Sequence, residues 1–289
     1  MSYVDSEITR QPECWSQARE VADQRAGLLP SPGERVAVIG CGTSWFMAQA
    51  YAALREASGA GETDAFTASE FPQRKYDRLV ALTRSGTTTE VVDVLEHTAI
   101  PSLAIVADDG TPATRAADAV IALPFASDQS VVMTSFATSA LALLRAHLGE
   151  DLDAAISDAQ VALDAPLPVD VVDIEQITYI GQGWTVGVAH EAALKAREAA
   201  TFWTESYPAM DYRHGPISIA GPHRATWAFG EAPEGLAAQV AATGGAFVSC
   251  GLDPLAELIV AQRTAIDLAR QRGLDPDAPR HLTRSVVLK

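Results

Sequence analysis

The sequence has few basic residues, few cysteines and no long hydrophobic run. Lys and Arg together number 21 against 37 Asp and Glu, which gives a formal net charge of −16. A nucleic-acid partner is therefore not expected, because phosphate backbones attract a basic surface. No stretch reaches the roughly 18 uncharged apolar residues that a membrane-spanning helix requires, so we expect no membrane partner either.

The three cysteines, Cys14, Cys41 and Cys250, are scattered and form no Cys-x-x-Cys pair. This spacing favours neither a zinc site nor a disulfide framework, and no bound metal is expected. The first residues lack the basic and apolar regions of a secretion signal, which predicts a cytoplasmic location. With 48% hydrophobic and 20% charged residues, the composition is that of an ordinary globular protein.

Short apolar runs alternate with helical stretches along the whole chain. The candidate strands are residues 35–40, 63–67, 79–82, 102–106 and 119–123, followed by 177–181 and 225–230. This alternation predicts an α/β fold in which parallel sheets are flanked by helices.

The chain also divides into two similar halves. A Pro- and Asp-rich break at 163–170 separates them, and the pattern apolar, Ile, Gly, any residue, Gly occurs at 38–42 and again at 179–183. Both are glycine turns from a strand to a helix. We therefore predict two tandem domains, residues 1–165 with an N-terminal helical segment and residues 166–289, each a parallel sheet flanked by helices.

Glycine turns of this kind are also found in dinucleotide-binding folds. The fingerprint requires a third glycine three residues after the second one. In this chain that position is Trp45 in the first turn and Val186 in the second. A bulky residue there would crowd the close packing of helix on strand that the fingerprint requires. No nicotinamide or flavin cofactor is expected.

The most informative segment is Thr83-Arg84-Ser85-Gly86-Thr87-Thr88-Thr89, which follows the apolar run 79–82 and precedes a helix-like run from Glu90. Hydroxyl groups and free backbone N–H groups converge at such a helix start, where the helix dipole favours an anion. Ser and Thr also cap helices in an ordinary way, but so many consecutive hydroxyl and glycine residues exceed what a cap needs. The segment predicts a binding site for a phosphate monoester.

A second segment, 190–198, carries titratable side chains. Glu191, Lys195 and Glu198 share one face of the predicted helix, because their spacing is i, i+4 and i+7. Two interpretations stay open: a solvated face with an ordinary ion pair, and a group with a chemical role. His214 is followed by Gly-Pro and is predicted to lie in a loop, where an imidazole suits proton transfer.

Together these segments resemble the sugar isomerase (SIS) domain family, and more closely the double-domain isomerase half of glucosamine-6-phosphate synthase and its stand-alone relatives. The resemblance runs through residues 41–44, 68–71, 85–87, 133–136, 191–198, 213–216 and 279–286. It implies two SIS domains, no cofactor, a phosphorylated sugar or amino sugar as ligand, and a homodimer with shared active sites. No glutamine-hydrolysing domain precedes the pair, so the synthase reaction itself is not expected of this chain.

The resemblance also implies roles for individual residues. The hydroxyls that hold the sugar phosphate or contact the sugar correspond to Thr83, Ser85, Thr88, Thr43 and Ser44. Glu198 corresponds to the carboxylate that moves a proton between C1 and C2, and Glu191 and Lys195 to supporting residues on the same helix face. His214 corresponds to the ring-opening histidine, which in the family reaches across a dimer interface.

The sequence departs from the family pattern at two arginines. Arg84 replaces a glutamine of the synthase turn and adds a cation that should tighten phosphate binding. Arg284 replaces a lysine able to form an imine with an open-chain ketose; an arginine cannot form that imine, and we expect it to steady the sugar's oxygens or phosphate by hydrogen bonds. Lys289, five residues further on, is a poor substitute.

From these features we predict an enzyme that isomerises or deaminates an amino-sugar 6-phosphate of the glucosamine-6-phosphate class, without metal or nucleotide. A fructosamine-6-phosphate deglycase and a non-catalytic phosphosugar sensor are the alternatives. The retained Glu198, Lys195 and His214 favour an enzyme, as does the lack of any basic segment for DNA. The sequence leaves open which sugar and epimer are used, and in which direction the reaction runs.

Overall fold

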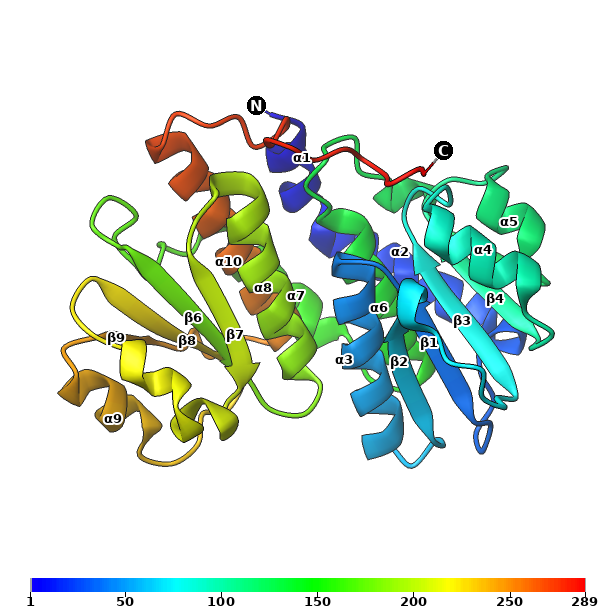
Figure 1. Cartoon of the computed structure of the whole chain (residues 1–289), viewed down its shortest axis with the longest axis horizontal. Helices are drawn as coiled ribbons and strands as arrows, with labels where there is room; N and C mark the ends of the chain where they lie inside the picture. Colours follow the sequence, from blue (N-terminus) through cyan, green and yellow to red (C-terminus); the bar gives the residue numbers. More distant parts are fainter. Residues whose placement is uncertain (1, 289) are drawn as a thin grey trace. The chain divides into compact units, whose positions relative to one another are not determined.

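The computed structural model describes residues 2–288 and contains two parallel β-sheets flanked by helices (Figure 1). The predicted α/β class with parallel sheets is confirmed. By their internal contacts, residues 3–152 and 283–288 form one compact unit, and residues 153–282 form a second. Within the described residues, every helix is too short or too polar to cross a lipid bilayer.

The division by contacts differs from the predicted boundary at 165/166 in two places. Helix α7 (Asp153–Asp164) belongs to the second unit, because Arg263 of α10 (Pro254–Gln271) donates to the carbonyls of Ala162, at 2.8 Å, and Ala165, at 2.6 Å. The C-terminal segment 283–288 belongs to the first unit. That each unit is an independent SIS domain stays a prediction.

The first unit has a five-stranded parallel sheet in the order β2-β1-β3-β4-β5. Its strands are β1 (Val36–Gly40), β2 (Thr63–Thr67), β3 (Arg78–Thr83), β4 (Ser102–Val106) and β5 (Ala119–Ala122). Its helices are α1 (Tyr3–Thr9), α2 (Gln11–Gln24), α3 (Thr43–Ala57), α4 (Thr89–His97), α5 (Pro112–Ala116) and α6 (Ser135–His147), with short 3₁₀ turns at Ala26–Leu28, Ala68–Glu70 and Pro124–Ala126. The central strands β1, β3 and β4 are almost wholly buried, as expected when helices cover both faces of a parallel sheet.

The second unit repeats this plan with four parallel strands in the order β7-β6-β8-β9. The strands are β6 (Gln176–Gly181), β7 (Thr204–Pro208), β8 (Arg224–Phe229) and β9 (Ala246–Val248). Besides α7 and α10, the unit contains α8 (Thr185–Ala200), α9 (Leu236–Ala242) and 3₁₀ turns at Asp211–His214 and Pro216–Ile219. The two edge strands β7 and β9 had not been predicted.

The repeated glycine turns have a common physical cause. A Cβ atom on Gly40 would lie 2.6 Å from the backbone carbon of Ser44, and one on Gly181 would lie 2.3 Å from the carbonyl oxygen of Thr185. In both units the helix start therefore packs directly against the end of the preceding strand. Only glycine permits this approach.

In each sheet the strand order reverses between two central neighbours, which are β1 and β3 in the first unit and β6 and β8 in the second. Open α/β sheets bind ligands outside the carboxyl ends of the strands at such a switch point. The loops after β1 and β3 are therefore the first place to look for a ligand site.

Candidate functional site

The predicted sugar- and phosphate-binding hydroxyls lie at neighbouring strand ends in the first unit. Thr43 and Ser44 begin α3 directly after β1, and Thr83 ends β3. Because β1 and β3 pair in parallel, with Ile39 opposite Ala81, these ends lie side by side at the switch point. The side chains of Thr43, Ser44, Thr83 and Ser85 are all buried.

The turn after β3 has a fixed shape. Gly86 has φ +61°, and a Cβ there would lie 2.0 Å from the hydroxyl of Thr111, so only glycine fits. Ser85 Oγ accepts a hydrogen bond from the backbone N–H of Thr87, at 3.2 Å. Thr88 is the N-cap residue of α4, yet its side chain makes no capping hydrogen bond. The Thr88 hydroxyl therefore does not cap α4, and its predicted contact with phosphate stays a prediction.

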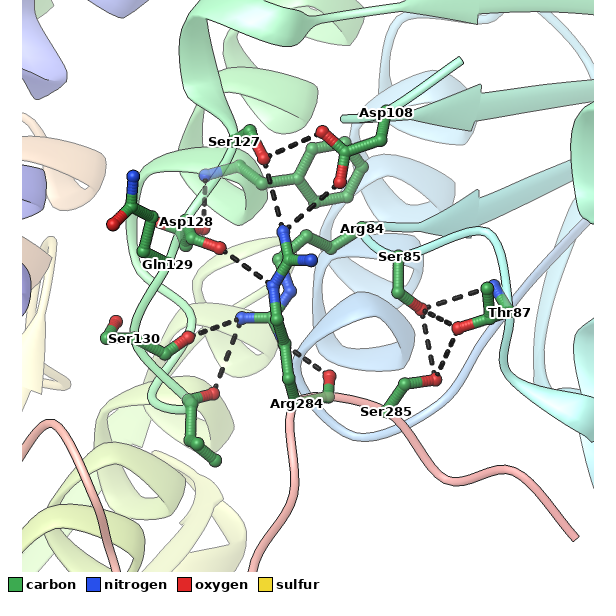
Figure 2. A network of polar contacts seen from close by, with 12 residues as sticks. Arg84, Ser85, Thr87, Asp108, Ser127, Asp128, Gln129, Ser130, Arg284 and Ser285 are labelled. Atoms are coloured by element: carbon green, nitrogen blue, oxygen red, sulfur yellow. Dashed lines mark hydrogen bonds and ion pairs between the residues drawn. The ribbon is translucent and has the colours of Figure 1, made fainter. Parts of the chain in front are cut away.

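Arg84 is buried, and its guanidinium holds backbone groups instead of facing the turn (Figure 2). Nη1 donates to the carbonyls of Ser130, at 3.0 Å, and Val131, at 3.4 Å, and Nη2 donates to the carbonyl of Arg284. Its predicted contact with phosphate stays a prediction. The observed contacts give Arg84 a clear structural use, which is to join the loop at 130–131 to the C-terminal segment.

Arg284 binds the same region of the first unit. Its Nε donates to the carbonyl of Asp128, at 3.0 Å. Its Nη2 donates to Asp108 Oδ2, at 3.1 Å, and to Ser127 Oγ, at 3.2 Å (Figure 2). Arg284 thus anchors the tail through the loop 127–128 and Asp108. The expected contact with sugar oxygens is untested, and Lys289 lies outside the described residues.

The loop that receives both arginines is held by two buried carboxylates. Asp128 accepts the backbone N–H groups of Ser135, at 2.9 Å, and Phe136, at 3.1 Å, at the start of α6. Glu7 accepts from the N–H of Gln129, at 2.6 Å, and from Ser130. Burial, together with the nearby Glu7, raises the pKa of Asp128. Neither acid had been predicted. The partners of Glu7 are far away in the sequence, whereas Asp128 lies only seven residues before its partner Ser135.

The titratable residues of α8 form a buried ion cluster in the second unit. Lys195 Nζ lies 2.5 Å from Glu198 Oε2 and 3.4 Å from Glu191 Oε1. The side chains of Lys195 and Glu191 are 1% and 0% exposed, and that of Glu198 is 21% exposed. The interpretation as a solvated helix face is therefore wrong. Burial would lower the pKa of Lys195, but the two carboxylates outweigh it and raise this pKa.

Glu198 alone among the three opens onto a pocket. The pocket has a volume of about 150 Å³ and is lined by Glu198, Ala199, Thr201, Gly273, Leu274, Asp275, Ala278, Pro279 and Arg280. A carboxylate with one side against an ammonium group and the other toward a cavity is suited to exchange protons with a small ligand.

His214 is exposed and ends the 3₁₀ turn Asp211–His214. Gly215 follows with φ +134°, a conformation that favours glycine. Among residues 2–288 no hydrogen bond or ion pair of the imidazole is found. The predicted loop is thus a short helical turn, and its histidine is accessible to solvent.

The predicted hydroxyl and arginine residues lie in the first unit, and Glu191, Lys195, Glu198 and His214 lie in the second. The structure brings Glu191, Lys195 and Glu198 into contact, whereas His214 makes no hydrogen bond or ion pair with them among the described residues. In the described part of the chain, no three His, Cys, Asp or Glu side chains are arranged to hold a metal ion.

The chain is similar over nearly its whole length to proteins named glutamine–fructose-6-phosphate aminotransferase (isomerizing). It is 26% identical to the one from Methanothermobacter thermautotrophicus and 24% identical to the one from Caulobacter vibrioides, with 99% of this chain covered in both. It spans only 58% and 59% of the length of these curated relatives. No protein-family model matches the chain.

Solved structures share the fold. Glucosamine-6-phosphate deaminase from Thermotoga maritima superposes with a TM-score of 0.80 at 23% identity, covering 99% of this chain and 100% of its own. Tagatose-6-phosphate ketose/aldose isomerase from Escherichia coli superposes with a TM-score of 0.82 at 19% identity. The match covers 98% of this chain and 97% of the isomerase chain. The C-terminal domain of glucosamine-fructose-6-phosphate aminotransferase from Francisella tularensis gives 0.78 at 20% identity, covering 96% and 98%.

Proposed function

We propose that this chain is a phosphosugar isomerase-type enzyme built from two SIS domains. The observation that carries the proposal is the turn at residues 83–88, which presents buried hydroxyls and a helix start at the switch point of the first sheet. The similarity to proteins named for phosphosugar reactions supports the same ligand class.

The proposed substrate is an amino-sugar 6-phosphate of the glucosamine-6-phosphate class. The names of the deaminase and aminotransferase relatives point to an amino sugar, and the ketose/aldose isomerase has the same fold. The proposed reactions are aldose–ketose interconversion, loss of ammonia, or both. No nucleotide or metal takes part, so turnover should survive exhaustive treatment with a chelator.

In the proposed mechanism Glu198 is the base. Its carboxylate removes the proton from C2 of the open-chain amino aldose, and the electrons of that C–H bond form the C1–C2 double bond of an enolamine while O1 gains a proton from solvent. The proton on Glu198 then goes to C1, and the nitrogen lone pair forms the C2=N bond of an iminium ion. Water adds to C2, the C–N bond breaks and ammonia leaves as the C2 ketone forms, so atoms and charge balance. Lys195, 2.5 Å away, holds the carboxylate in place and balances its charge.

We propose a homodimer in which His214 serves the partner's site, as the resemblance implies. An exposed imidazole without a partner among the described residues is consistent with this role. Mixing Glu198→Gln and His214→Ala protomers should then restore part of the activity, because some hybrid dimers contain one intact site. No recovery in a mixture shown to exchange subunits would place His214 in its own chain's site or outside catalysis.

One turnover screen tests the proposed function. Hexose, hexosamine and fructosamine 6-phosphates are offered, and sugar isomers, ammonia and released amines are measured together with binding. Isomer formation or ammonia release from glucosamine 6-phosphate supports the proposal. Release of an amine from a fructosamine phosphate would identify a deglycase, binding without turnover a sensor, and neither binding nor turnover would contradict the phosphosugar assignment.

A further inference from the structure

The C-terminal segment lies across the hydroxyl turn within the first unit (Figure 2). The carbonyl of Val286 accepts from the N–H of Thr89, at 3.2 Å, and the N–H of Leu288 donates to Thr89 Oγ1, at 2.9 Å. Since Thr89 is the first residue of α4, the tail is hydrogen-bonded to the helix start that follows the turn. This places Ser285 next to the predicted phosphate site.

Three hydroxyls from two distant parts of the chain form a closed triangle. Ser85 Oγ lies 3.0 Å from Thr87 Oγ1 and 3.1 Å from Ser285 Oγ, and Thr87 Oγ1 lies 2.9 Å from Ser285 Oγ. Figure 2 shows the three side chains pointing toward one another. Hydroxyl hydrogens rotate freely, so all three can turn toward one further oxygen placed above the triangle at hydrogen-bond distance.

The position of Ser285 is fixed by its neighbours in the tail. Arg84 donates to the carbonyl of Arg284, and Thr283 Oγ1 donates to the carbonyl of Ser285, at 2.8 Å. The Arg284 side chain is itself bound to Asp128 and Asp108. Contacts on both sides of Ser285 therefore hold its hydroxyl against the turn before any ligand arrives, which lowers the entropic cost of binding.

The surroundings also favour an anion. The triangle lies beside the first residues of α4, where the helix dipole is positive. Hydroxyls that accept from one another when the site is empty become charge-assisted donors when an anionic oxygen is present.

We propose that Ser285 is a further phosphate-binding residue. Its hydroxyl and those of Ser85 and Thr87 would together donate three hydrogen bonds to one phosphate oxygen. The inference rests on the proposed phosphate site and adds the tail to it. It follows that phosphate and the tail stabilise each other's position, because coupling between two binding events is reciprocal.

Calorimetric titration with inorganic phosphate, and separately with glucosamine 6-phosphate, tests this. Ser285→Ala should weaken both affinities about tenfold or more, since a hydrogen bond to a charged group contributes roughly 1.5–3 kcal/mol. Ser285→Thr keeps the hydroxyl and should restore most of the affinity. Val287→Ala, which changes an exposed tail side chain, is the matched control and should bind like the wild type.

Limited proteolysis supplies a readout that a purely structural role would not give. Saturating inorganic phosphate should slow cleavage of the tail in the wild type and fail to do so in Ser285→Ala. Unchanged or tighter phosphate binding by Ser285→Ala would overturn the inference, and tighter binding would mean that Ser285 obstructs the turn. If Ser85→Ala weakens binding while Ser285→Ala does not, only this inference fails; a wild type that binds no phosphate would contradict the proposed site as well.

Discussion

Replacing Lys195 with methionine should destabilise the second unit strongly. Met has a similar length but no charge, so the variant removes the ammonium group that the carboxylates of Glu191 and Glu198 both contact. Glu191 is 0% exposed and cannot recover hydration from solvent, whereas Glu198 is 21% exposed and can do so in part. Removing one partner of a buried ion pair costs about 3–5 kcal/mol, and we expect a loss of free energy of unfolding in that range.

Urea denaturation measures this loss, with Lys75→Met as the matched control. Lys75 is exposed, and its substitution should change the free energy of unfolding by no more than about 0.5 kcal/mol. The double variant Glu191→Gln/Lys195→Met removes both buried charges and should recover a large part of the loss. A loss below about 1 kcal/mol in Lys195→Met would refute the view that the cluster is a buried, mutually dependent ion network.

Three further changes have defined outcomes. Ser85→Ala with Thr88→Ala should weaken phosphosugar binding by several kcal/mol, and equal affinity of the wild type for a sugar and its 6-phosphate would contradict the phosphate turn. Borohydride added during turnover should leave no sugar adduct on the protein, because the neighbouring carboxylates keep Lys195 protonated and Arg284 cannot form an imine. An adduct on Lys195 or Lys289 in the mass spectrum would contradict this. The raised pKa of Asp128 means that the folded state holds this proton more tightly than the unfolded chain does, so the contribution of Asp128 to stability should fall as pH rises from 3.8 through the raised pKa. Asp128→Asn removes this contribution, so the stability of the variant relative to wild type should increase over the same pH range in thermal melts. A difference that stays constant with pH would contradict the raised pKa.

The sheet framework could be predicted because central parallel strands carry a local signal. The central strand 102–106 has the predicted bounds, and so does the edge strand 63–67, although it is only partly buried. The edge strand β7 was missed because it has no continuous apolar run, and β9 was missed because its apolar run is only three residues long. The start of α10 did have a usable signal, since Asp253 caps it ahead of Pro254.

The candidate site was predictable only where its residues are consecutive. The turn at 83–89 could be recognised from its own composition, but its partner Ser285 lies 200 residues further along the chain. The same holds for Glu7 and Ser130, which are 123 residues apart. Contacts of this kind depend on which loops the folded sheet brings to one edge. They cannot be predicted from a pattern of neighbouring residues in the sequence.

The central claim is that Glu198 moves the proton during sugar isomerisation, and Glu198→Gln tests it most directly. The substitution keeps the side chain's shape and removes the base, while Glu96→Gln makes the same change at an exposed position of α4. In deuterated water, exchange at C1 and C2 of the hexosamine 6-phosphate should fall at least about 100-fold in Glu198→Gln, with ligand affinity changed little. Exchange that continues at the wild-type rate in Glu198→Gln, with the ligand bound, would contradict the account.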